Sequence, residues 1–484
     1  MKKTLFTILL AAVMSSIPLY GQSGKAPNFN ELTTEKEFTK KADENFPTTN
    51  WIDNADTSWY NSTSTSFTLG NAEQLAGLAK LVFDGNDFLG KTIIISNDID
   101  VGKHLWTSIG YGYQKPFSGT VLGNNHTIKN VLINRPTGDF VGFFGQAFKA
   151  TFKDLKIDNI KVRAKDTAGC FVGNLSTNSL VDNCHVTNAE IITTSYNIGG
   201  FAGSVLTDSF VNNSSFEGYV EGKNQVGGFT GNLWDKSTIT NSFAKGKVVG
   251  GYIIGGFVGF TTMAFGPNRM NTIKDSYSIS EVEAELERAG GFAGYAQTAL
   301  TVENTYTVST VKAPMAVGTY AGMIGSAKIT NSYFDETISI LDGVGTFEFE
   351  GVTADVTGNT TTAMKNETFA DKLNASNSEK PWKFVNGLND NYPVLKFQNL
   401  NTQEYLTKNI NVRIYPTATD KMLNIESNKE VLDYKINDLN GRSYSKIKLT
   451  NNQKQIDVSS LPKGIYIITI QTTGGIKNLK FIKK

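Results

Sequence analysis

The stretches IGGFAG (198–203), VGGFTG (226–231), IGGFVG (254–259) and AGGFAG (289–294) repeat one pattern of glycines around a phenylalanine. Three further copies are less regular, and the closing glycines of all seven are Gly145, Gly173, Gly203, Gly231, Gly259, Gly294 and Gly325. The steps between them are 28, 30, 28, 28, 35 and 31 residues. A sustained period of this length is typical of repeat proteins, in which one copy buries its apolar residues only by stacking on the next.

Two other positions keep step with these glycines. A large apolar residue stands two places before each closing glycine: Phe143, Phe171, Phe201, Phe229, Phe257, Phe292 and, in the last copy, Met323. Between the copies lies a second signature, as in VDNC (181–184) and ITNS (239–242). Its polar residue is Asn183, Asn213, Asn241, Asp275, Asn304 or Asn331, with Asp154 as the counterpart in the first copy.

The repeats predict an all-β fold, a right-handed parallel β-helix. Each copy alternates apolar and polar residues between turn residues and lacks a helical period, which disfavours helical repeat proteins. The copies are also shorter than the 40–45 residues of a propeller blade. We expect the phenylalanines to stack inside, and the glycines to take corners that need positive φ or close backbone approach. The Asn column would form an amide ladder at a bend.

The regions outside the repeats predict caps and a second domain. Residues 70–85 (GNAEQLAGLAKLVFDG) read as an amphipathic helix with Asn71 as N-cap and Gln74 completing a capping box, placed to cover the open N-terminal end. Residues 360–376 are expected to be helical, and 380–397 to form a closing cap. From Asn409 onward, short alternating strands predict a small β-sandwich.

The first 21 residues predict a secretory signal peptide, because Lys2 and Lys3 precede a short apolar run and small residues follow it. The domain organisation expected is therefore a signal peptide (1–21), a lead segment (22–64), the β-helix with its cap helix (65–345), a C-terminal cap and linker (346–408) and the sandwich (409–484). The composition is that of a globular chain, with 39% hydrophobic and 19% charged residues. A net charge of +1 with scattered basic residues gives no nucleic-acid footprint.

The repeat region resembles the GLUG-motif repeat proteins. The resemblance covers about residues 65–335, including the segment LWTSIGYGYQKPFSGTVLGNNHTIKNV (105–131) and the NYPVL ending (391–395). Two copies depart from the pattern, at Cys170, which replaces the second glycine, and in AGMIG (321–325). The resemblance fixes no reaction, since such repeats occur in adhesin-like surface proteins and beside peptidase domains.

The last 75 or so residues resemble the type A sorting domain of the type IX secretion system. IYP (414–416), DLNGR (438–442), LPKGIYIITI (461–470) and the basic end carry the resemblance, with Tyr415, Pro416, Gly441 and Gly464 as its marker residues. Thr417 and Ala418 depart from the family's usual Asn-Pro. The resemblance implies that the secretion machinery is a partner. It also implies that the chain reaches the outer cell surface or the medium after its signal peptide and sorting domain are removed.

The two cysteines, Cys170 and Cys184, leave two alternatives open. In an exported protein they could form a disulfide that closes a short loop. The alternative is that both are small buried apolar side chains within the repeats, and this reading is favoured. The 35-residue step marks an insertion at 261–271, which is either a tolerated surface loop or a site specific to that copy.

The chemistry-bearing residues favour binding over catalysis. The three histidines form no zinc motif, and no cofactor or metal site is predicted. Asp98 and Asp100 could contribute to a calcium site, but a cation of this kind needs six or more oxygens, so a solvated turn is favoured. The charged run 280–288 reads as a solvated strand face. Aromatic residues that could stack on sugars are Trp106, Tyr111, Tyr113 and Trp234. Trp106 could instead pack at the cap.

The sequence therefore predicts a secreted or cell-surface, non-catalytic β-helix with an adhesive, ligand-binding or envelope-structural role, in contact with an extracellular glycan or protein. The alternative is a glycan-degrading β-helix enzyme, a polysaccharide lyase or glycosidase, because such enzymes gather an acid/base pair on one face of the coil.

Overall fold

A computed structural model describes residues 46–112, 114–262, 269–375, 377–400, 412–427, 431–438, 443–448, 455–472 and 475–484. Residues from Pro47 to Lys484 form one unit. The predicted signal peptide, residues 22–45 of the lead segment, Tyr113 and Gly441 lie outside the described residues. The account below concerns the unit from Pro47 onward.

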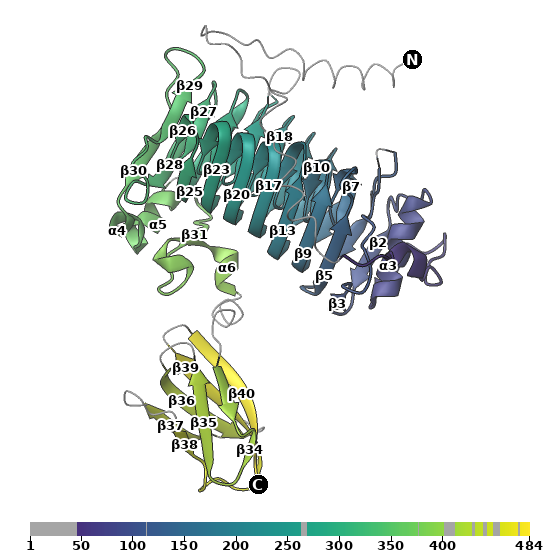
Figure 1. Ribbon diagram of the computed structural model, residues 1–484, viewed down its shortest axis with the longest axis vertical. Helices are drawn as coiled ribbons and strands as arrows, with labels where there is room; N and C mark the ends of the chain where they lie inside the picture. The colour runs from purple at the N-terminus through teal and green to yellow at the C-terminus, as the bar shows by residue number, and fades with distance from the viewer. Residues whose placement is uncertain are drawn as a thin grey trace. The chain divides into compact units, whose positions relative to one another are not determined.

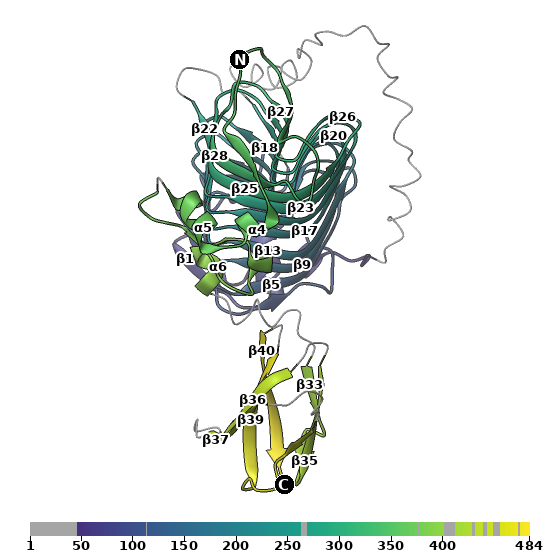
Figure 2. The ribbon, with the colours of Figure 1, turned by 90° about the vertical axis from the view of Figure 1, so that its left-hand side faces the viewer.

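The repeats form a parallel β-solenoid of about nine turns (Figure 1). Figure 2 looks along the stack of turns from its C-terminal end. Each full turn contributes strands to four columns, and each strand pairs in parallel with its counterparts in the turns before and after it. The predicted parallel β-helix is confirmed.

Two of the columns begin at the N-terminal end. The first column contains β1 (Ser66–Leu69), β2 (Thr92–Ile95), β4 (Thr120–Leu122), β8 (Thr151–Lys153), β12 (Leu180–Asp182), β16 (Phe210–Asn212), β19 (Thr238–Thr240), β22 (Asn271–Lys274) and the starts of β25 (Leu300–Lys312) and β28 (Lys328–Asp335). The second column contains β3 (Ile99–Asp100), β5 (Thr127–Asn134), β9 (Lys156–Ala164), β13 (His185–Thr193), β17 (Ser215–Gly227), β20 (Phe243–Gly255), β23 (Tyr277–Gly290), the rest of β25 and β28, and β30 (Val356–Asn359).

The other two columns flank the glycine-rich motif. The third column contains β6 (Asp139–Val141), β10 (Asp166–Gly169), β14 (Tyr196–Gly199), the ends of β17, β20 and β23, and β26 (Met315–Gly318). The fourth column is a separate sheet of β7 (Phe144–Phe148), β11 (Val172–Ser176), β15 (Ala202–Leu206), β18 (Thr230–Trp234), β21 (Val258–Thr261), β24 (Ala293–Ala296), β27 (Ala321–Ile324) and β29 (Val344–Phe347). Strand pairing thus continues to Asn359, beyond the predicted end at 345.

The closing glycine of each copy is required by close approach between turns, not by positive φ. A Cβ on Gly231 would lie 2.3 Å from the backbone nitrogen of Ile198 in the preceding turn, and one on Gly259 would lie 2.7 Å from the carbonyl carbon of Gln225. The left-handed corner itself is taken by other residue types, such as Asn197 (φ 58°) and Ile253 (φ 62°). The glycine therefore makes room for a corner that the preceding turn forms.

The structure corrects the alignment of the last copy. Ala293 pairs with Ala321, so Gly294 corresponds to Gly322 and not to Gly325. The step is then 28 residues, like most of the others. The stacked aromatic of this copy is Tyr320 rather than Met323, which faces outward beside Tyr295. The predicted alignment was wrong because AGMIG resembles the motif, although its last glycine lies three residues after the true counterpart, Gly322.

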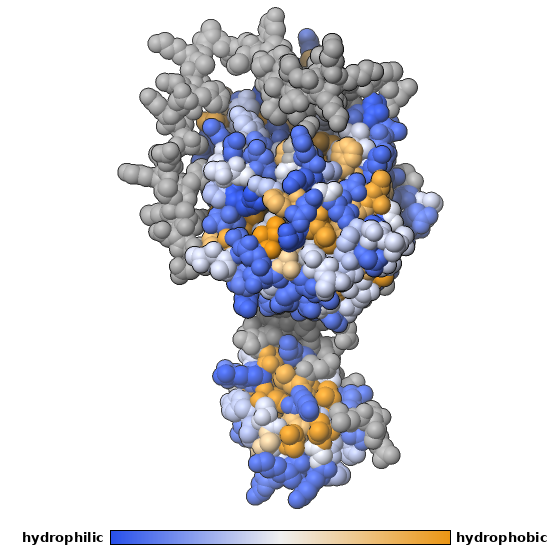
Figure 3. Space-filling model, turned by 90° about the vertical axis from the view of Figure 1, so that its right-hand side faces the viewer, coloured by the Kyte–Doolittle hydropathy of each residue, from blue (hydrophilic) through white to orange (hydrophobic). Residues whose placement is uncertain are grey.

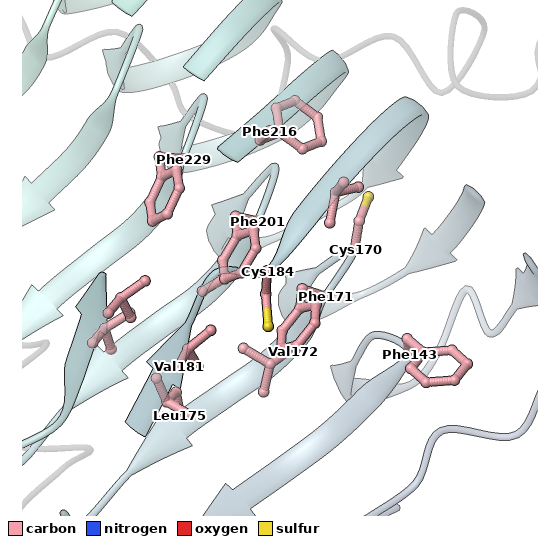
Figure 4. Packing of buried hydrophobic residues seen from close by; sticks show 14 of the residues in the cluster. Phe143, Cys170, Phe171, Val172, Leu175, Val181, Cys184, Phe201, Phe216 and Phe229 are labelled. Carbon is pink, nitrogen blue, oxygen red and sulfur yellow. The ribbon is translucent and has the colours of Figure 1, made fainter. Parts of the chain in front are cut away.

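The phenylalanines form the predicted inner stack (Figure 4). Neighbouring rings from Phe171 to Tyr320 lie nearly parallel, with centroids 4.8–5.1 Å apart; the stack runs Phe171, Phe201, Phe229, Phe257, Phe292, Tyr320. Phe143 instead stacks on Trp106 at 4.9 Å, and Phe144 lies between it and Phe171. The rings are 0–1% exposed.

The predicted Asn column forms the corner between the first and second columns. All seven residues adopt left-handed backbone, with φ of 46–55°; they are Asp154, Asn183, Asn213, Asn241, Asp275, Asn304 and Asn331. Asn is among the residues that tolerate this region best. The ladder is direct in places: Asn183 donates to Asp154 and Asn331 to Asn304. In the middle, Asn213 and Asn241 donate to the neighbouring Asp182 and Asn212 instead.

The residue after each corner was missed as a structural position. Ser214, Ser242 and Ser276 are fully buried, and each hydroxyl accepts from the backbone N–H of its counterpart in the preceding turn at 3.2–3.4 Å. Each also donates to the carbonyl two residues earlier. Cys184 occupies the same position. The last residue of the motifs VDNC, ITNS and IKDS occupies this position, and its small size in each motif could have indicated it.

The N-terminal cap is confirmed as a helix, α3 (Ala72–Phe83). Asn71 accepts from the Gln74 N–H, and the Gln74 side chain accepts from the Gly70 N–H, which completes the capping box. Leu75, Leu78, Ala79 and Val82 are buried in the solenoid core. In Figure 3, the side of the molecule nearest the cap is mostly hydrophilic, with scattered apolar residues.

Part of the predicted lead segment belongs to the folded unit. The short helix η1 (Trp51–Asn54) places Trp51 in the core, where its indole N–H donates to the Val101 carbonyl at 2.7 Å. Trp59 and Tyr60 pack against the same core. These aromatics carry no periodicity, so sequence patterning alone did not assign them to the fold.

The C-terminal cap packs on the side of the solenoid. Residues 361–400, which we call the strap, contain α4 (Thr361–Met364), α5 (Glu367–Asn374), β31 (Trp382–Lys383), η2 (Asn389–Asn391), β32 (Val394–Leu395) and α6 (Lys396–Leu400). The strap packs on outward-facing Phe243, Tyr277, Tyr306 and Tyr333 of the second column. Figure 1 shows β31 and α6 beside the solenoid strands. Stacked aromatics on the outer face explain this, since they would otherwise face water.

The C-terminal residues form two small sheets around one core. One sheet has β33 (Val412–Tyr415), β35 (Met422–Ser427) and β38 (Gln455–Asp457). The other has β34 (Ala418–Thr419), β40 (Gly475–Lys483), β39 (Gly464–Thr472), β36 (Val431–Asp438) and β37 (Ser443–Lys448). Ile414 and Leu423 of the first sheet share a hydrophobic core with Ile468 and Phe481 of the second, as a sandwich requires.

Candidate functional site

Of the four aromatic residues predicted to contact a ligand, Trp106, Tyr111 and Trp234 are described, and these three do not form a common site. Trp106 is 2% exposed, stacks on Phe143 and donates to its carbonyl oxygen, so it is a core residue. Tyr111 lies under the Arg135 guanidinium, 3.6 Å from the ring centroid, and beside Phe83. Trp234 is half-buried on the fourth column, in register with Leu206. These aromatic residues lie near turns in the sequence, but that does not show whether their side chains face the core or the solvent.

The acidic run at 96–102 is engaged in hydrogen bonds rather than open to a cation. Asp98 accepts from the Lys129 ammonium at 2.8 Å and from the Thr127 N–H, and these bonds hold its pKa below the usual value. Asp100 accepts from the Gly102 N–H and from Asn130. Among the residues that the structure describes, no three His, Cys, Asp or Glu side chains gather to hold a metal ion.

A hollow of about 770 Å³ opens beside this run. Trp51, Glu73 and Lys103 line it from the cap side, and Asp100, Asn130 and Asn159 line it from the second column. Asn130 and Asn159 sit at a bend in β5 and β9, with φ of 60° and 58°. Asn159 donates to Asn130 at 2.7 Å, and Asn130 donates to Asp100 at 2.8 Å. A second amide ladder, which the sequence analysis did not identify, therefore lines this hollow.

A second hollow of about 330 Å³ follows along the same bend. It is lined by Asn188, Ala189, Glu217, Gly218, Lys245 and Gly246. The two glycines are required by the close approach of the turns, because a Cβ on Gly218 would lie 2.2 Å from the Ala189 carbonyl oxygen, and one on Gly246 1.8 Å from that of Gly218. Tyr219 follows Gly218 on the outer face of β17.

The two hollows lie on neighbouring turns. Asn159 borders the first and Asn188 the second, and their strands pair directly on either side of these residues, at Asp158–Thr187 and Ile160–Ala189. We call the two hollows and the bend that joins them the axial groove. Asn130, Asn159 and Asn188 hold equivalent positions of three successive turns. The register then shifts, so that Gly218 pairs with Ala189, and Gly246 pairs with Gly218 in the next turn. These five residues form the floor of the groove.

Charges of both signs line the groove. Lys129 pairs in register with Asp100 on one side and Asp158 on the other. Asp158 accepts from Thr187 at 2.6 Å and from Asn188 at 2.7 Å. At the far end, burial lowers the pKa of Lys245, while nearby Glu217 and Asp390 of the strap act to raise it. The groove therefore ends where the strap begins.

The strap is fixed to the solenoid by polar as well as aromatic contacts. Tyr306 donates to the Pro393 carbonyl at 2.6 Å, and Tyr392 donates to Asp335 at 2.6 Å. Phe397 of α6 stacks between the His185 and Phe243 rings, above the small side chain of Ser215, which lies between them in register. Burial lowers the pKa of His185 to about 4, and Lys156 acts in the same direction.

The charged run at 280–288 behaves as a paired strand face. Lys247 lies 2.9 Å from Glu281 and 3.0 Å from Glu283, and Lys312 lies 3.4 Å from Glu283. The insertion at 261–271 is tied down by Arg269, which pairs with Asp208 and Asp235 of two earlier turns. Residues 263–268 of the insertion lie outside the described part of the chain.

The two cysteines are separate buried thiols, which agrees with the second of the two alternatives. Their sulfur atoms do not point toward one another (Figure 4). Burial raises the pKa of both thiols well above the usual range.

The comparisons with known proteins place the C-terminal sandwich. Residues 413–484 match the family model described as the secretion system C-terminal sorting domain. Tyr415 ends β33, Pro416 follows it, and Gly464 opens β39. No curated protein matches the chain. Among the described residues, no helix is long and apolar enough to cross a membrane. The chain therefore ends in a type IX sorting domain, which directs the β-solenoid to the cell surface or the extracellular space.

Proposed function

We propose that the protein is an exported, non-catalytic binding protein that holds an extended ligand along the axial groove, in an adhesive or envelope-structural role. The observation that carries this is the alignment of the two hollows. They lie on neighbouring turns along one bend of the second column, and an amide side chain recurs at this bend in three successive turns. A regular linear site of this kind suits an extended ligand better than a compact one.

The state of the carboxylates supports binding without turnover. General acid catalysis needs a carboxyl group whose pKa is raised toward the working pH. In the groove, Asp98 is hydrogen-bonded to Lys129 and has a lowered pKa, and Asp158 is held by Thr187 and Asn188. These groups are arranged to stabilise the turns and to present a fixed polar surface.

One observation favours the alternative of a polysaccharide lyase. Lys245 lies in the second hollow beside Glu217, and burial lowers its pKa, as a lysine acting as a general base would require. Glu217 and Asp390 raise the pKa of Lys245 and so oppose the effect of burial. We therefore assign Lys245 a role in positioning the ligand and not in proton transfer.

Binding and turnover can be tested on the same preparation. The full chain is incubated with a panel of purified polysaccharides and matrix proteins, and both retention and the release of reducing ends or unsaturated products are measured. We expect retention with no growth of products. If the wild type releases products and Lys245→Gln abolishes that release, the protein is a lyase instead. If the wild type is retained by none of the polysaccharides or matrix proteins, the binding proposal is refuted.

A further inference from the structure

We propose that the ligand of the axial groove is an extended, uncharged glycan that binds with about one sugar residue per solenoid turn. This rests on the proposed binding function and specifies its ligand. Five bend positions form the floor: Asn130, Asn159, Asn188, Gly218 and Gly246. Each belongs to a successive turn, so the positions repeat at the strand spacing of about 4.8 Å. The first three carry an amide side chain, and the last two are glycines. That interval is close to the length of one pyranose residue in an extended chain.

The floor offers the groups that recognise sugar hydroxyls. A primary amide has two donor hydrogens and a carbonyl acceptor. Asn159 and Asn188 are exposed, and within the described residues each donates one hydrogen bond, to Asn130 and Asp158 respectively. Each therefore presents its remaining donor and its oxygen outward, already oriented by the bond it makes. Fixed polar groups of this kind give a site its specificity at little entropic cost.

The second hollow adds an apolar contact. Gly218 and Gly246 line this hollow and present backbone rather than side chains to it. Tyr219 stands next to this gap, with its hydroxyl donating to Glu221. Sugar rings combine an apolar face with polar edges, and a tyrosine ring fixed at its polar end matches that character.

The charges argue against a polyanion. Lys129 lies between Asp100 and Asp158 in register, and Lys245 lies beside Glu217. Recognition of nucleic acid or of an acidic polysaccharide needs a continuous track of positive charge. In the axial groove, both of these lysines have an acidic neighbour, so the net charge along the groove is close to zero.

The position of the groove argues against an extended peptide. Peptides bound in strand form add to an open sheet edge, where backbone groups lack partners. The strands β5, β9, β13, β17 and β20 are interior to the sheet, and each pairs with a neighbour on both sides. The groove therefore offers side chains and not a free backbone edge.

The test compares three glycine variants of the full chain. Asn159→Gly and Asn188→Gly remove a groove amide while glycine keeps the left-handed backbone at no steric cost (φ of 58° and 52°). Asn213→Gly is the matched control. It has the same residue type, φ of 48° and a ladder hydrogen bond to Asp182, but it lies at the corner between the first and second columns.

Affinity electrophoresis in hydroxyethylcellulose, arabinoxylan, galactomannan and dextran gives the retention of each variant, with heparin and polygalacturonate as charged probes. We expect at least one neutral polymer to retard the wild type. Each groove variant should weaken binding about fivefold, the effect of one hydrogen bond, and the control should match the wild type. With oligosaccharides of the retained polymer, affinity should rise with length up to about five residues, one for each bend in the groove.

Three results would overturn the glycan assignment: retention by the charged polymers alone, equal loss in Asn213→Gly, or affinity that does not depend on length. The proposed function has a separate readout in the attachment of the full chain to bacterial and host cells. If the groove variants weaken attachment although no neutral glycan binds, only the ligand is wrong. If the groove variants change neither glycan binding nor attachment to cells, the proposed binding function is wrong as well.

Discussion

At the scale of the residue, two positions of the repeat support each other across neighbouring turns. The phenylalanine fills the interior and stacks on its counterparts, while the closing glycine lets the next turn come close enough for that stacking. A left-handed corner in one turn lies against the glycine of the following turn, so packing between turns restricts both positions, in addition to local conformation. The sequence showed both positions, but their coupling became visible only in three dimensions.

Phe229→Ala should destabilise the protein by about 3–5 kcal/mol, because the ring is fully buried and stacked on both sides. The free energy of unfolding from denaturant titration measures the loss. Phe210→Ala, at a 37% exposed phenylalanine in a neighbouring turn, is the control and should cost under about 1 kcal/mol. Equal losses in the two variants would show that the inner stack does not carry the stability assigned to it.

Cys170 and Cys184 should resist thiol reagents in the folded protein. Both are fully buried, and burial raises their pKa, so little reactive thiolate forms at neutral pH. Mass spectrometry after maleimide treatment should find no label in the native protein and two labels after unfolding without a reductant. A mass two protons lower, with no labelling after unfolding, would mean that the pair is oxidised.

At the scale of the element, the strap shows where sequence reasoning stopped. The helical segments and the apolar residues of 360–397 were detectable, and a cap was the natural prediction for them. Their target was not, because Phe243, Tyr277 and Tyr306 appear in the sequence as ordinary strand residues. Only the register reveals that they align on the outer face and need a cover.

The contact between α6 and the solenoid should weaken with acid. His185 has a pKa of about 4 in the folded protein against 6.5 in the unfolded chain. Between these values the unfolded state binds the extra proton, so stability is complete above about pH 6.5 and falls as the pH drops toward 4. The loss from this group is at most about 3 kcal/mol.

His185→Gln should remove this part of the pH dependence. The measurement is the free energy of unfolding from pH 8 to pH 4.5, in the variant and the wild type. Above pH 7 the two curves should run parallel, and below pH 6 the wild type should fall more steeply. Parallel curves over the whole range would show that His185 is protonated without cost in the folded protein.

At the scale of the whole molecule, the sequence predicted the architecture better than the site. The backbone geometry of each turn requires glycine and asparagine at fixed positions. Because this requirement recurs in every repeat, the pattern is visible in the sequence, and the parallel β-helix could be predicted. Ligand contacts depend on which way a side chain faces, and there Trp106 was misleading because its packing on Phe143 is a contact between distant residues. Asn130, Asn159 and Asn188 keep steps of 29 residues, close to those of the glycines, and that spacing was a usable signal.

Export should depend on the C-terminal sandwich, and folding of the solenoid should not. The sandwich has a hydrophobic core of its own that shares no residue with the solenoid core or the strap core. Deleting residues 409–484 should therefore leave the solenoid folded, which resistance to proteolysis of the purified product can check. In the native host the same deletion should leave the protein in the periplasm, as fractionation and surface labelling would record. A folded truncated protein that still reaches the surface in full amount would mean that the signal for export lies in the solenoid or the strap.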